Sequence, residues 1–472
     1  MADSSSDSLG HSSSSSDTES STTNYGHVED EPAHFLYRDG ALSWGSSKLL
    51  DENIICVTSQ PDSSTAHTIF SLAPVEEGSK IPFELRTTRT TLLPQEFLER
   101  HLFKGLPAYL RPGNEIHVLI STLSGTGLAP GFFDDILHPV LLAIGLADFQ
   151  YTVLRTKDTE SVIEFARATL LPAANDGKKQ TVLMLSGDGG MVDTVNGLLE
   201  DEKRSETYKR PTLALLPLGT GNALFHSLHK PTVGGVPSIY IQGLRTLLHG
   251  TPKPLPIFQA TFSPGARLIT NEAQTTSPLK NNTLYGAVVA SYGLHATLVA
   301  DSDTTEYRKH GDKRFGLVAK DLLFPEDGAK PHAYHAEVSF LKDGHKEVVN
   351  REEHGYVLST LVSNLEKLFT ISPHSKPFDR SLRVVHFGAL GGEDTMNVMK
   401  AAYDNGKHVG ADNVGYENVE TLRIDFKEPG ESWKWRRCCI DGLIVGVEEG
   451  GWMEVSLLGS GEEAVDVVAD AP

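Results

Sequence analysis

Two apolar runs that each end in a glycine-rich loop constrain the fold of this chain most strongly. Residues 181–185 lead into Ser-Gly-Asp-Gly-Gly at 186–190, and residues 212–216 lead into Pro-Leu-Gly-Thr-Gly-Asn at 217–222. Each loop opens into a helix-like segment. Glycine lets a backbone approach a phosphate closely, and the N-terminus of a helix favours anions. The pattern predicts phosphoryl transfer, with Asp188 placed where a reacting hydroxyl could meet a carboxylate.

The central part of the chain alternates strand-like runs with helix-like runs. Such alternation is typical of a mainly parallel sheet with helices on both faces. Ligands of such sheets bind at the carboxyl ends of the strands, where the glycine loops lie. The strand-like runs are 116–120, 149–154, 181–185 and 212–216, and the helix-like runs are 130–146, 161–171, 191–199 and a segment from residue 222.

A third loop supports the same interpretation. It follows the first strand-like run and contains Ser124, Gly125 and Gly127. None of the three loops has the pattern of an ordinary P-loop, which is Gly, four residues, then Gly-Lys-Ser or Gly-Lys-Thr. Three such loops after three strands of one sheet predict one phosphate-binding surface.

After the proline-rich stretch 251–256 the pattern changes to strand-like runs, with helical stretches at 304–323 and near 395–402. Turn residues separate the runs, as in an antiparallel β-sandwich. The predicted fold is therefore an N-terminal doubly wound, Rossmann-like α/β domain followed by an antiparallel β-sandwich domain, with a nucleotide cleft between them. The strand-like runs are 257–262, 284–290, 333–341, 356–362, 382–387, 421–426, 433–440 and 452–457.

The composition of the chain predicts five parts. The first is rich in serine and aspartate with almost no apolar residue, so it cannot offset the entropy of ordering. A helix is expected at 94–110, ahead of the α/β alternation. The parts are a disordered tail at 1–30, a small β-rich element at 31–92, the α/β domain at 93–251, the β-sandwich at 252–460 and an acidic tail at 461–472.

The net charge of the chain and the length of its apolar segments limit which molecules it can bind and where in the cell it is expected. The formal net charge is −20, which argues against a nucleic-acid partner and limits any membrane contact to a local surface. The three cysteines give no disulfide framework, the N-terminus lacks a secretory pattern, and the apolar stretch 138–147 is too short to span a bilayer. A cytoplasmic protein is expected, with peripheral contact to intracellular membranes left open.

These motifs resemble the catalytic-domain superfamily of the diacylglycerol kinases, and within it the sphingosine and ceramide kinases. The similarity runs from about residue 116 to residue 457. It rests on Ser-Gly-Asp-Gly-Gly-Met-Val-Asp-Thr-Val-Asn-Gly-Leu at 186–198, Leu-Pro-Leu-Gly-Thr-Gly-Asn-Ala at 216–223, Tyr-Arg-Lys-His-Gly-Asp-Lys-Arg-Phe at 307–315, Gly-Lys-His-Val at 406–409, Val-Gly-Tyr at 414–416 and Asp-Gly at 441–442.

The resemblance implies roles for matching residues. Asp188 would take the proton from a lipid primary hydroxyl as it attacks the γ-phosphate of ATP, with Mg²⁺ offsetting the phosphate charge. Thr156 would make another nucleotide contact, and Arg308 and Arg314 would reach phosphate oxygens. The partners implied are a lipid held in the second domain and a transient membrane surface. The residues expected to line the nucleotide phosphates are Ser124, Gly125, Gly127, Gly187, Gly189, Gly219, Thr220, Gly221 and Asn222.

The chain departs from the family pattern at positions that bear on the acceptor and the nucleotide. Ser121, Thr122 and Thr126 replace an Asn-Pro start and a lysine in the first loop. Val299 falls where sphingosine kinases carry the aspartate that meets the sphingoid head group, and Asp301 and Asp303 are the candidates to replace it. Leu443 replaces a glutamate of the terminal motif.

The prediction is an ATP-dependent lipid kinase that acts on the primary hydroxyl of a sphingoid base. Two alternatives stay open: a diacylglycerol or ceramide kinase, and a degenerate kinase that binds nucleotide or lipid as a non-catalytic scaffold. No protein-bound metal site is predicted, because the pair His332 and His335 has no third ligand beside it.

Overall fold

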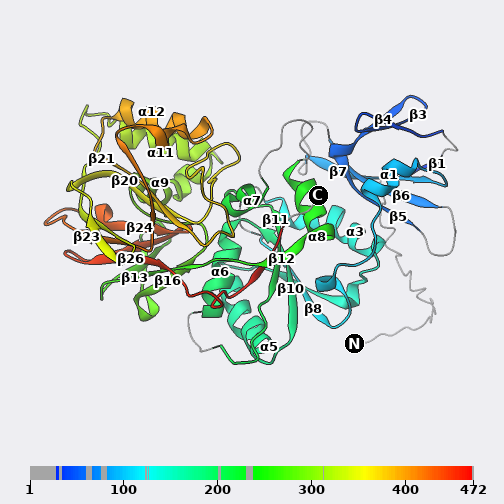
Figure 1. Cartoon of the computed structure of the whole chain (residues 1–472), viewed down its shortest axis with the longest axis horizontal. Coiled ribbons are helices and arrows are strands. Elements are labelled where there is room, and N and C mark those ends of the chain that lie inside the picture. The colour runs from blue at the N-terminus through cyan, green and yellow to red at the C-terminus, as the bar shows by residue number, and fades with distance from the viewer. Residues whose placement is uncertain are drawn as a thin grey trace, which may run out of the picture.

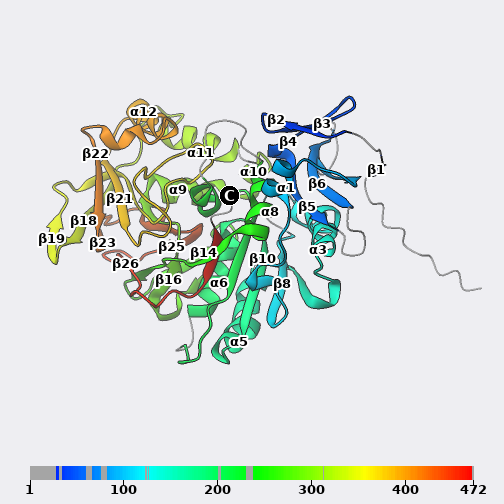
Figure 2. The ribbon, with the colours of Figure 1, turned by 45° about the vertical axis from the view of Figure 1, so that its right-hand side comes forward.

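The computed structural model describes residues 28–30, 34–59, 66–75, 82–122, 125, 127–199, 204–229, 238–311 and 313–469. The expected disordered tail falls outside these ranges, apart from strand β1 (Val28–Asp30). Figure 1 shows three neighbouring regions: a small β-rich region near the start of the chain, a central α/β region and a large β-rich region. The turned view in Figure 2 keeps the α/β region between the other two.

The α/β region is built on a six-stranded sheet in the order β12-β27-β11-β10-β8-β9. Strands β9, β8, β10, β11 and β27 run parallel, and only β12 runs antiparallel to its neighbour β27. The mainly parallel sheet is therefore confirmed. Its strands are β8 (Asn114–Ile120), β9 (Tyr151–Arg155), β10 (Lys179–Ser186), β11 (Thr212–Pro217), β12 (Thr251–Pro254) and β27 (Asp466–Ala469).

Helices cover both faces of this sheet, as the alternation of buried strand residues requires. In β10, Val182 and Met184 pack with the helices of one face, and Leu183 and Leu185 pack with those of the other. One face holds α4 (Ser161–Phe165), α5 (Leu171–Asn175) and α6 (Asp188–Leu199); the other holds α2 (Ala129–Phe132), α3 (His138–Ala143) and α8 (Ile239–His249). The short helix α7 (Ala223–Leu228) follows β11.

The large β-rich region is a 14-stranded antiparallel network, in agreement with the predicted antiparallel second part. Asn196 of α6 joins the two regions, because its side chain both donates to the carbonyl of Tyr285 at 2.8 Å and accepts from the N–H of Tyr285 at 3.0 Å. The strands are β13 (Phe258–Phe262), β14 (Arg267–Thr270), β15 (Thr275–Pro278), β16 (Thr283–Gly286), β17 (Val289–Gly293), β18 (Tyr334–Lys342), β19 (His345–Val348), β20 (Glu353–Thr360), β21 (Leu382–Gly388), β22 (Val414–Val419), β23 (Thr421–Phe426), β24 (Arg437–Ile440), β25 (Leu443–Gly446) and β26 (Trp452–Leu457).

The small β-rich region packs on α8. Arg245 of α8 donates hydrogen bonds to the carbonyls of Ile54 at 2.9 Å and of Asp51. The predicted helix at 94–110 is shorter in the structure, because Leu102 has an extended backbone with a ψ of 124° that ends α1 (Gln95–His101). The strands are β2 (Leu36–Arg38), β3 (Ala41–Trp44), β4 (Ser47–Leu50), β5 (Ile54–Ser59), β6 (His67–Pro74) and β7 (Phe83–Thr90).

The described residues of the large β-rich region form four α-helices, which are α9 (Leu294–Ser302), α10 (Thr305–Arg308), α11 (Lys313–Leu323) and α12 (Gly392–Tyr403). The single helix predicted at 304–323 is two helices, since Gly311 between them has a φ of +55°. The strand predicted at 433–440 begins only at Arg437, because Trp433–Arg436 forms a 3₁₀ turn.

The last described residues differ most from the sequence-based expectation. The sequence predicts an acidic tail at 461–472, but Asp466–Ala469 form β27 inside the α/β sheet. Val467 and Val468 are buried there. The strand pairs with β11 on one side and with β12 on the other. Within the described ranges, no helix has the length and apolar composition needed to cross a bilayer.

Candidate active site

The two glycine loops that follow β10 and β11 touch through their backbones. A Cβ atom at position 219 would lie 2.2 Å from the Cα of Gly187, and a Cβ at position 187 would lie 2.5 Å from the carbonyl oxygen of Gly221. The N–H of Leu218 also donates to the carbonyl of Ser186 at 3.2 Å. Glycine is required at 187 and 219 because no side chain fits between the loops. The two loops therefore form one surface at the carboxyl ends of the parallel strands.

The loop that follows β8 joins this surface. A Cβ atom on Gly125 would lie 2.8 Å from the carbonyl oxygen of Leu218, and Gly125 has a φ of +63°. Gly127 has a φ of +71° and open space around it. Ser124 and Thr126 lie outside the described residues, so their predicted places in this loop have no structural account.

Thr156 fastens the same loop to the end of β9. Its hydroxyl oxygen accepts from the N–H of Thr122 at 2.9 Å, and the hydroxyl of Thr122 donates to the carbonyl of Thr156 at 2.6 Å. The side chain of Thr156 is buried. In this arrangement Thr156 shapes the loop, and a direct contact with a nucleotide stays a prediction.

Asp188 is the first residue of α6 and is half-buried. One carboxylate oxygen accepts from the N–H of Ala223 at 2.6 Å and the other accepts from the N–H of Leu224 at 3.1 Å. The carboxylate thus binds the N-terminus of α7 across the loops. Burial raises the pKa of Asp188 above its usual range, and the two N–H donors oppose that rise.

The remaining residues of the second glycine loop surround this carboxylate. Asn222 is buried and donates from its amide to the carbonyl of Gly219 at 2.9 Å, which closes the loop on itself. A Cβ on Gly221 would lie 3.6 Å from the carboxylate of Asp188. Thr220 is half-buried, and Gly189 is exposed with open space where a side chain would be.

Asp441 belongs to the same site, although its role is not among those assigned to individual residues from the sequence. It lies between β24 and β25 with a φ of +47°. Its buried carboxylate accepts from the N–H groups of Ala287 at 2.6 Å and Val289 at 2.5 Å, and also from that of Val288. Burial, opposed by these donors, and to a smaller extent the charge of Asp188 together raise the pKa of Asp441 to about 7. The Asp-Gly pair at 441–442 was the available sequence signal.

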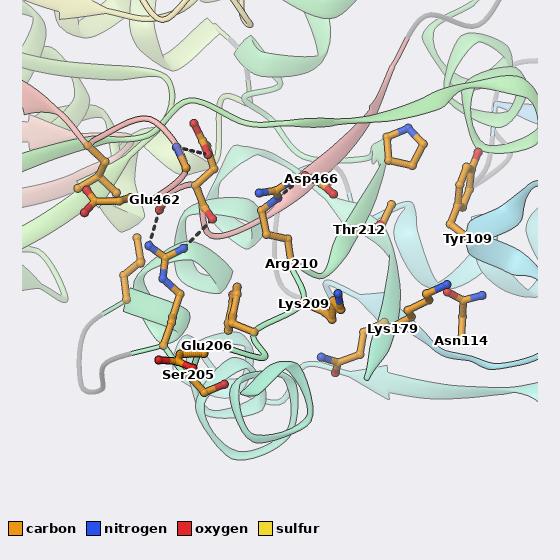
Figure 3. Close-up of a pocket in the computed structure, with 18 of the residues that line it drawn as sticks. Tyr109, Asn114, Lys179, Ser205, Glu206, Lys209, Arg210, Thr212, Glu462 and Asp466 are labelled. Atoms are coloured by element: carbon orange, nitrogen blue, oxygen red, sulfur yellow. Dashed lines mark hydrogen bonds and ion pairs between the residues drawn. The ribbon is translucent and has the colours of Figure 1, made fainter. Parts of the chain in front are cut away.

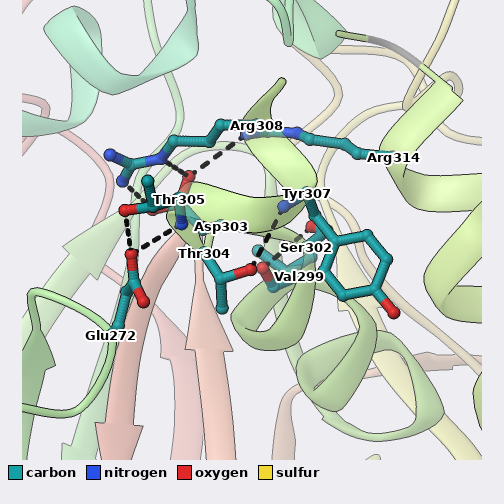
Figure 4. A network of polar contacts seen from close by, with 9 residues as sticks. All are labelled: Glu272, Val299, Ser302, Asp303, Thr304, Thr305, Tyr307, Arg308 and Arg314. Carbon is teal, nitrogen blue, oxygen red and sulfur yellow. Dashed lines mark hydrogen bonds and ion pairs between the residues drawn. The ribbon is translucent and has the colours of Figure 1, made fainter. Parts of the chain in front are cut away.

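The residues predicted to meet phosphate and the lipid head group are paired with one another. The guanidinium of Arg308 donates to both carboxylate oxygens of Asp303, at 3.0 and 2.7 Å, and Arg314 donates to the same carboxylate at 3.3 Å (Figure 4). Asp301 forms an ion pair with Arg437 at 2.8 Å. Among the described residues, neither Arg308 nor Arg314 makes a hydrogen bond or ion pair with a glycine loop. Val299 packs beside Ala296, Cys439 and Ile444.

This surface lies inside a segment that matches a known family. Residues 115–260 match the family model of the diacylglycerol kinase catalytic domain.

Sphingosine kinases are among the known proteins whose sequences are similar to this chain. The chain is 28% identical to sphingosine kinase 1 of Homo sapiens over 200 residues. The matched segment is 42% of this chain and 46% of that protein. It is 26% identical over 200 residues to sphingosine kinase 1 of Arabidopsis thaliana, covering 42% and 35% respectively. The chain thus spans less than half the length of these relatives. A crystal structure of a diacylglycerol kinase from Bacillus anthracis aligns with 14% identity over 76% of this chain and 98% of that one, with a TM-score of 0.47.

One large cavity lies away from the glycine loops. It has a volume of about 1000 Å³ and is lined by the first residues of three parallel strands, Asn114, Lys179 and Thr212. Figure 3 shows these residues together with Arg210 and Asp466, which form an ion pair at 2.6 Å. The cavity therefore lies at the amino ends of the strands, opposite the glycine loops.

A smaller cavity lies in the large β-rich region. Its volume is about 30 Å³, and Leu294, Leu323, Tyr334 and Trp435 are among its lining residues. This space holds about one water molecule. A lipid chain would have to open it by moving the helices that line it.

The carboxylates near the glycine loops are held by backbone N–H groups and are not grouped with further metal-ligand side chains among the described residues. Both oxygens of Asp188 and of Asp441 already accept backbone N–H groups. Within the described ranges, no three His, Cys, Asp or Glu side chains are grouped to hold a metal. Mg²⁺ commonly keeps several waters and binds through substrate phosphates. The proton transfer and phosphoryl transfer proposed for this chain therefore use no metal held by its own side chains.

Proposed function

We propose that the chain is an ATP-dependent lipid kinase whose nucleotide phosphates lie over the three glycine loops. The observation that carries the proposal is the backbone contact between Gly187 and Gly219 beside Asp188. Close packing of two glycine loops leaves backbone N–H groups, with no side chains in the way, at one edge of the sheet. Positioning of phosphate by such groups supplies most of the catalysis in phosphoryl transfer.

Asp188 acts as the general base in this proposal. Each of its oxygens accepts one N–H group, so lone pairs remain for a lipid hydroxyl. Burial raises its pKa, which makes the carboxylate a stronger base. The proton moves from the hydroxyl to Asp188 as that hydroxyl oxygen attacks the γ-phosphate, and ADP leaves with the electrons of the broken bond.

The acceptor lipid carries a primary hydroxyl. A sphingoid base also carries an ammonium, which needs a free carboxylate nearby. Asp301 is paired with Arg437, and Asp303 is paired with Arg308 and Arg314. The Asp301–Arg437 pair, together with Val299 in place of a carboxylate, favours the second candidate, a lipid with an uncharged head group such as diacylglycerol or ceramide. The enzyme would meet such a lipid at a transient membrane surface.

The test incubates the purified chain with labelled ATP and, separately, sphingosine, ceramide and diacylglycerol. A labelled lipid supports the proposal and identifies the acceptor. Asp188→Asn should lower the rate at least 100-fold, within the range of a lost general base, while ATP affinity changes less than threefold. Asp412→Asn alters an exposed carboxylate and is the matched control. Nucleotide binding without any labelled product would instead support the scaffold alternative.

A further inference from the structure

The segment that carries Arg308 is fixed by a residue from a distant turn. Glu272 lies between β14 and β15 in a turn whose residues Asn271, Glu272 and Ala273 all have positive φ angles. Its carboxylate accepts from the N–H of Thr305 at 2.6 Å and from the hydroxyl of the same residue (Figure 4). Both hydrogen bonds lower the pKa of Glu272, and the bond from the hydroxyl of Thr305 has the larger effect. Glu272 therefore holds the start of α10 as an ionised carboxylate.

Asp303 lies five residues before Arg308 in the sequence, and its carboxylate accepts hydrogen bonds from the Arg308 guanidinium. The edge formed by Nε and Nη2 of Arg308 binds both oxygens of Asp303. A guanidinium presents that same edge to two oxygens of a phosphate. The Nη1 of Arg314 also faces this carboxylate, while the buried Nε of Arg314 has no hydrogen-bond partner among the described residues. One carboxylate thus satisfies two arginines at once.

We infer that Asp303 is a positioning residue that holds Arg308 and Arg314 together until nucleotide phosphates replace it. The inference rests on the proposed function, because it takes the two arginines to be phosphate contacts. Asp303 keeps the guanidinium groups close in the absence of nucleotide and competes with the phosphates for them. Glu272 keeps the segment in place when the Asp303 contacts are exchanged. The two carboxylates therefore act in opposite directions on nucleotide affinity.

The solvent exposure of Asp303 and Arg308 determines how strongly Asp303 competes with ATP phosphates for the arginine. The side chains of Asp303 and Arg308 are 51% and 57% exposed, so water screens the pair and its removal has a modest effect. The lost negative charge also favours a polyanion nearby. Removing the carboxylate of Asp303 should tighten ATP binding about three- to tenfold at low salt, and the gain should shrink as salt is added.

Calorimetric titration of the full chain with ATP tests this inference. Asp303→Asn and Asp303→Ser should both lower the dissociation constant three- to tenfold, and damage to the fold could not produce such tightening. Glu272→Gln should raise it several-fold. Glu306→Gln is the matched control, because Glu306 is a carboxylate of the same helix that pairs with Lys309 at 3.1 Å and leaves both arginines untouched.

The outcomes separate the inference from the proposed function. Equal or weaker ATP binding by both Asp303 variants, with clear binding by the unaltered chain, overturns the inference and leaves the kinase proposal standing. An equal gain in Glu306→Gln also overturns it, since the effect would then be one of net charge alone. Absence of ATP binding in every variant overturns the kinase proposal and the inference together.

Discussion

The negative charge of Asp188 raises the pKa of Asp441, although the two residues belong to different regions of the fold. Asp188 begins α6 in the α/β region, and Asp441 lies between two strands of the large β-rich region. The carboxylate of each is held by backbone N–H groups. The two regions therefore share one electrostatic environment at their junction.

This coupling predicts how the titration of Asp441 responds to a distant substitution. Its carboxyl should titrate with a midpoint of about 7 in the unaltered chain, and the midpoint should fall in Asp188→Asn, because one unfavourable charge has been removed. Carbon-13 NMR of labelled aspartate carboxyls measures the midpoint. Asp193→Asn is the control and should leave it in place, and an unchanged midpoint in Asp188→Asn would contradict the coupling.

The contact between the glycine loops predicts a strong difference between two similar substitutions. Gly219→Ala places a Cβ 2.2 Å from the Cα of Gly187, so the backbone must move. We expect a loss of about 1–3 kcal/mol in the free energy of unfolding, as for other overpacked sites, together with weaker ATP binding. Gly189→Ala meets open space and should lose less than about 1 kcal/mol. Denaturant unfolding compares the two, and equal stability of both variants would refute the contact.

The pKa of Asp193 predicts a dependence of stability on pH. Burial, followed by the charge of Glu160, raises this pKa to about 7 in the folded chain, from an ordinary value of 3.8. Between these values the folded state keeps the proton and the unfolded state loses it, so stability falls as pH rises from about 4 to about 7. The slope from this group is at most about 1.4 kcal/mol per pH unit.

Asp193→Asn should therefore raise the thermal midpoint at pH 8 and leave it nearly unchanged at pH 4. The remaining slope of the variant should be shallower than that of the unaltered chain. Thermal unfolding followed by circular dichroism at each pH measures both. A variant that is less stable at pH 8 than the unaltered chain would show that Asp193 is favourably ionised in the fold.

The surroundings of Val299 predict a change of acceptor. Val299→Asp would place a carboxylate on α9 that no arginine of the described residues already occupies. The rate with sphingosine relative to diacylglycerol should rise at least tenfold, because an ammonium gains a partner. Val299→Asn has nearly the same shape without the charge and should keep the original ratio. Product analysis with both lipids measures the ratio, and an equal rise in both variants would show that polarity alone matters.

The central sheet could be predicted because the sequence signals for its strands, loops and helices lie next to one another along the chain. Each strand, loop and helix from residue 114 to residue 228 follows the previous one along the chain, and the glycine loops mark the strand ends. The gathering of Gly125, Gly187 and Gly219 on one surface then follows from parallel strands alone. The same logic gave the antiparallel second region, whose strands are bounded by turn residues.

Features that depend on distant partners could not be predicted. β27 is only four residues long and stands in an acidic segment, so its two valines give a weak strand signal until it pairs with β11 and β12. The pairing of Asp301 with Arg437 joins residues that are far apart in the sequence, so spacing gives no indication of it. Asp303 is close to Arg308 and Arg314, but a short segment of polar residues does not reveal which carboxylate faces which guanidinium.

The position of β27 between β11 and β12 has a consequence for biosynthesis. A ribosome that has released residues 114–254 has produced every other strand of the central sheet, yet β11 and β12 still lack the neighbour that lies between them. The strand that contains Val467 and Val468 can insert between β11 and β12 only after the whole β-rich region has emerged from the ribosome. The nascent chain is thus expected to complete its central sheet only after the β-rich region has emerged, with two unpaired strand edges exposed to chaperones until then.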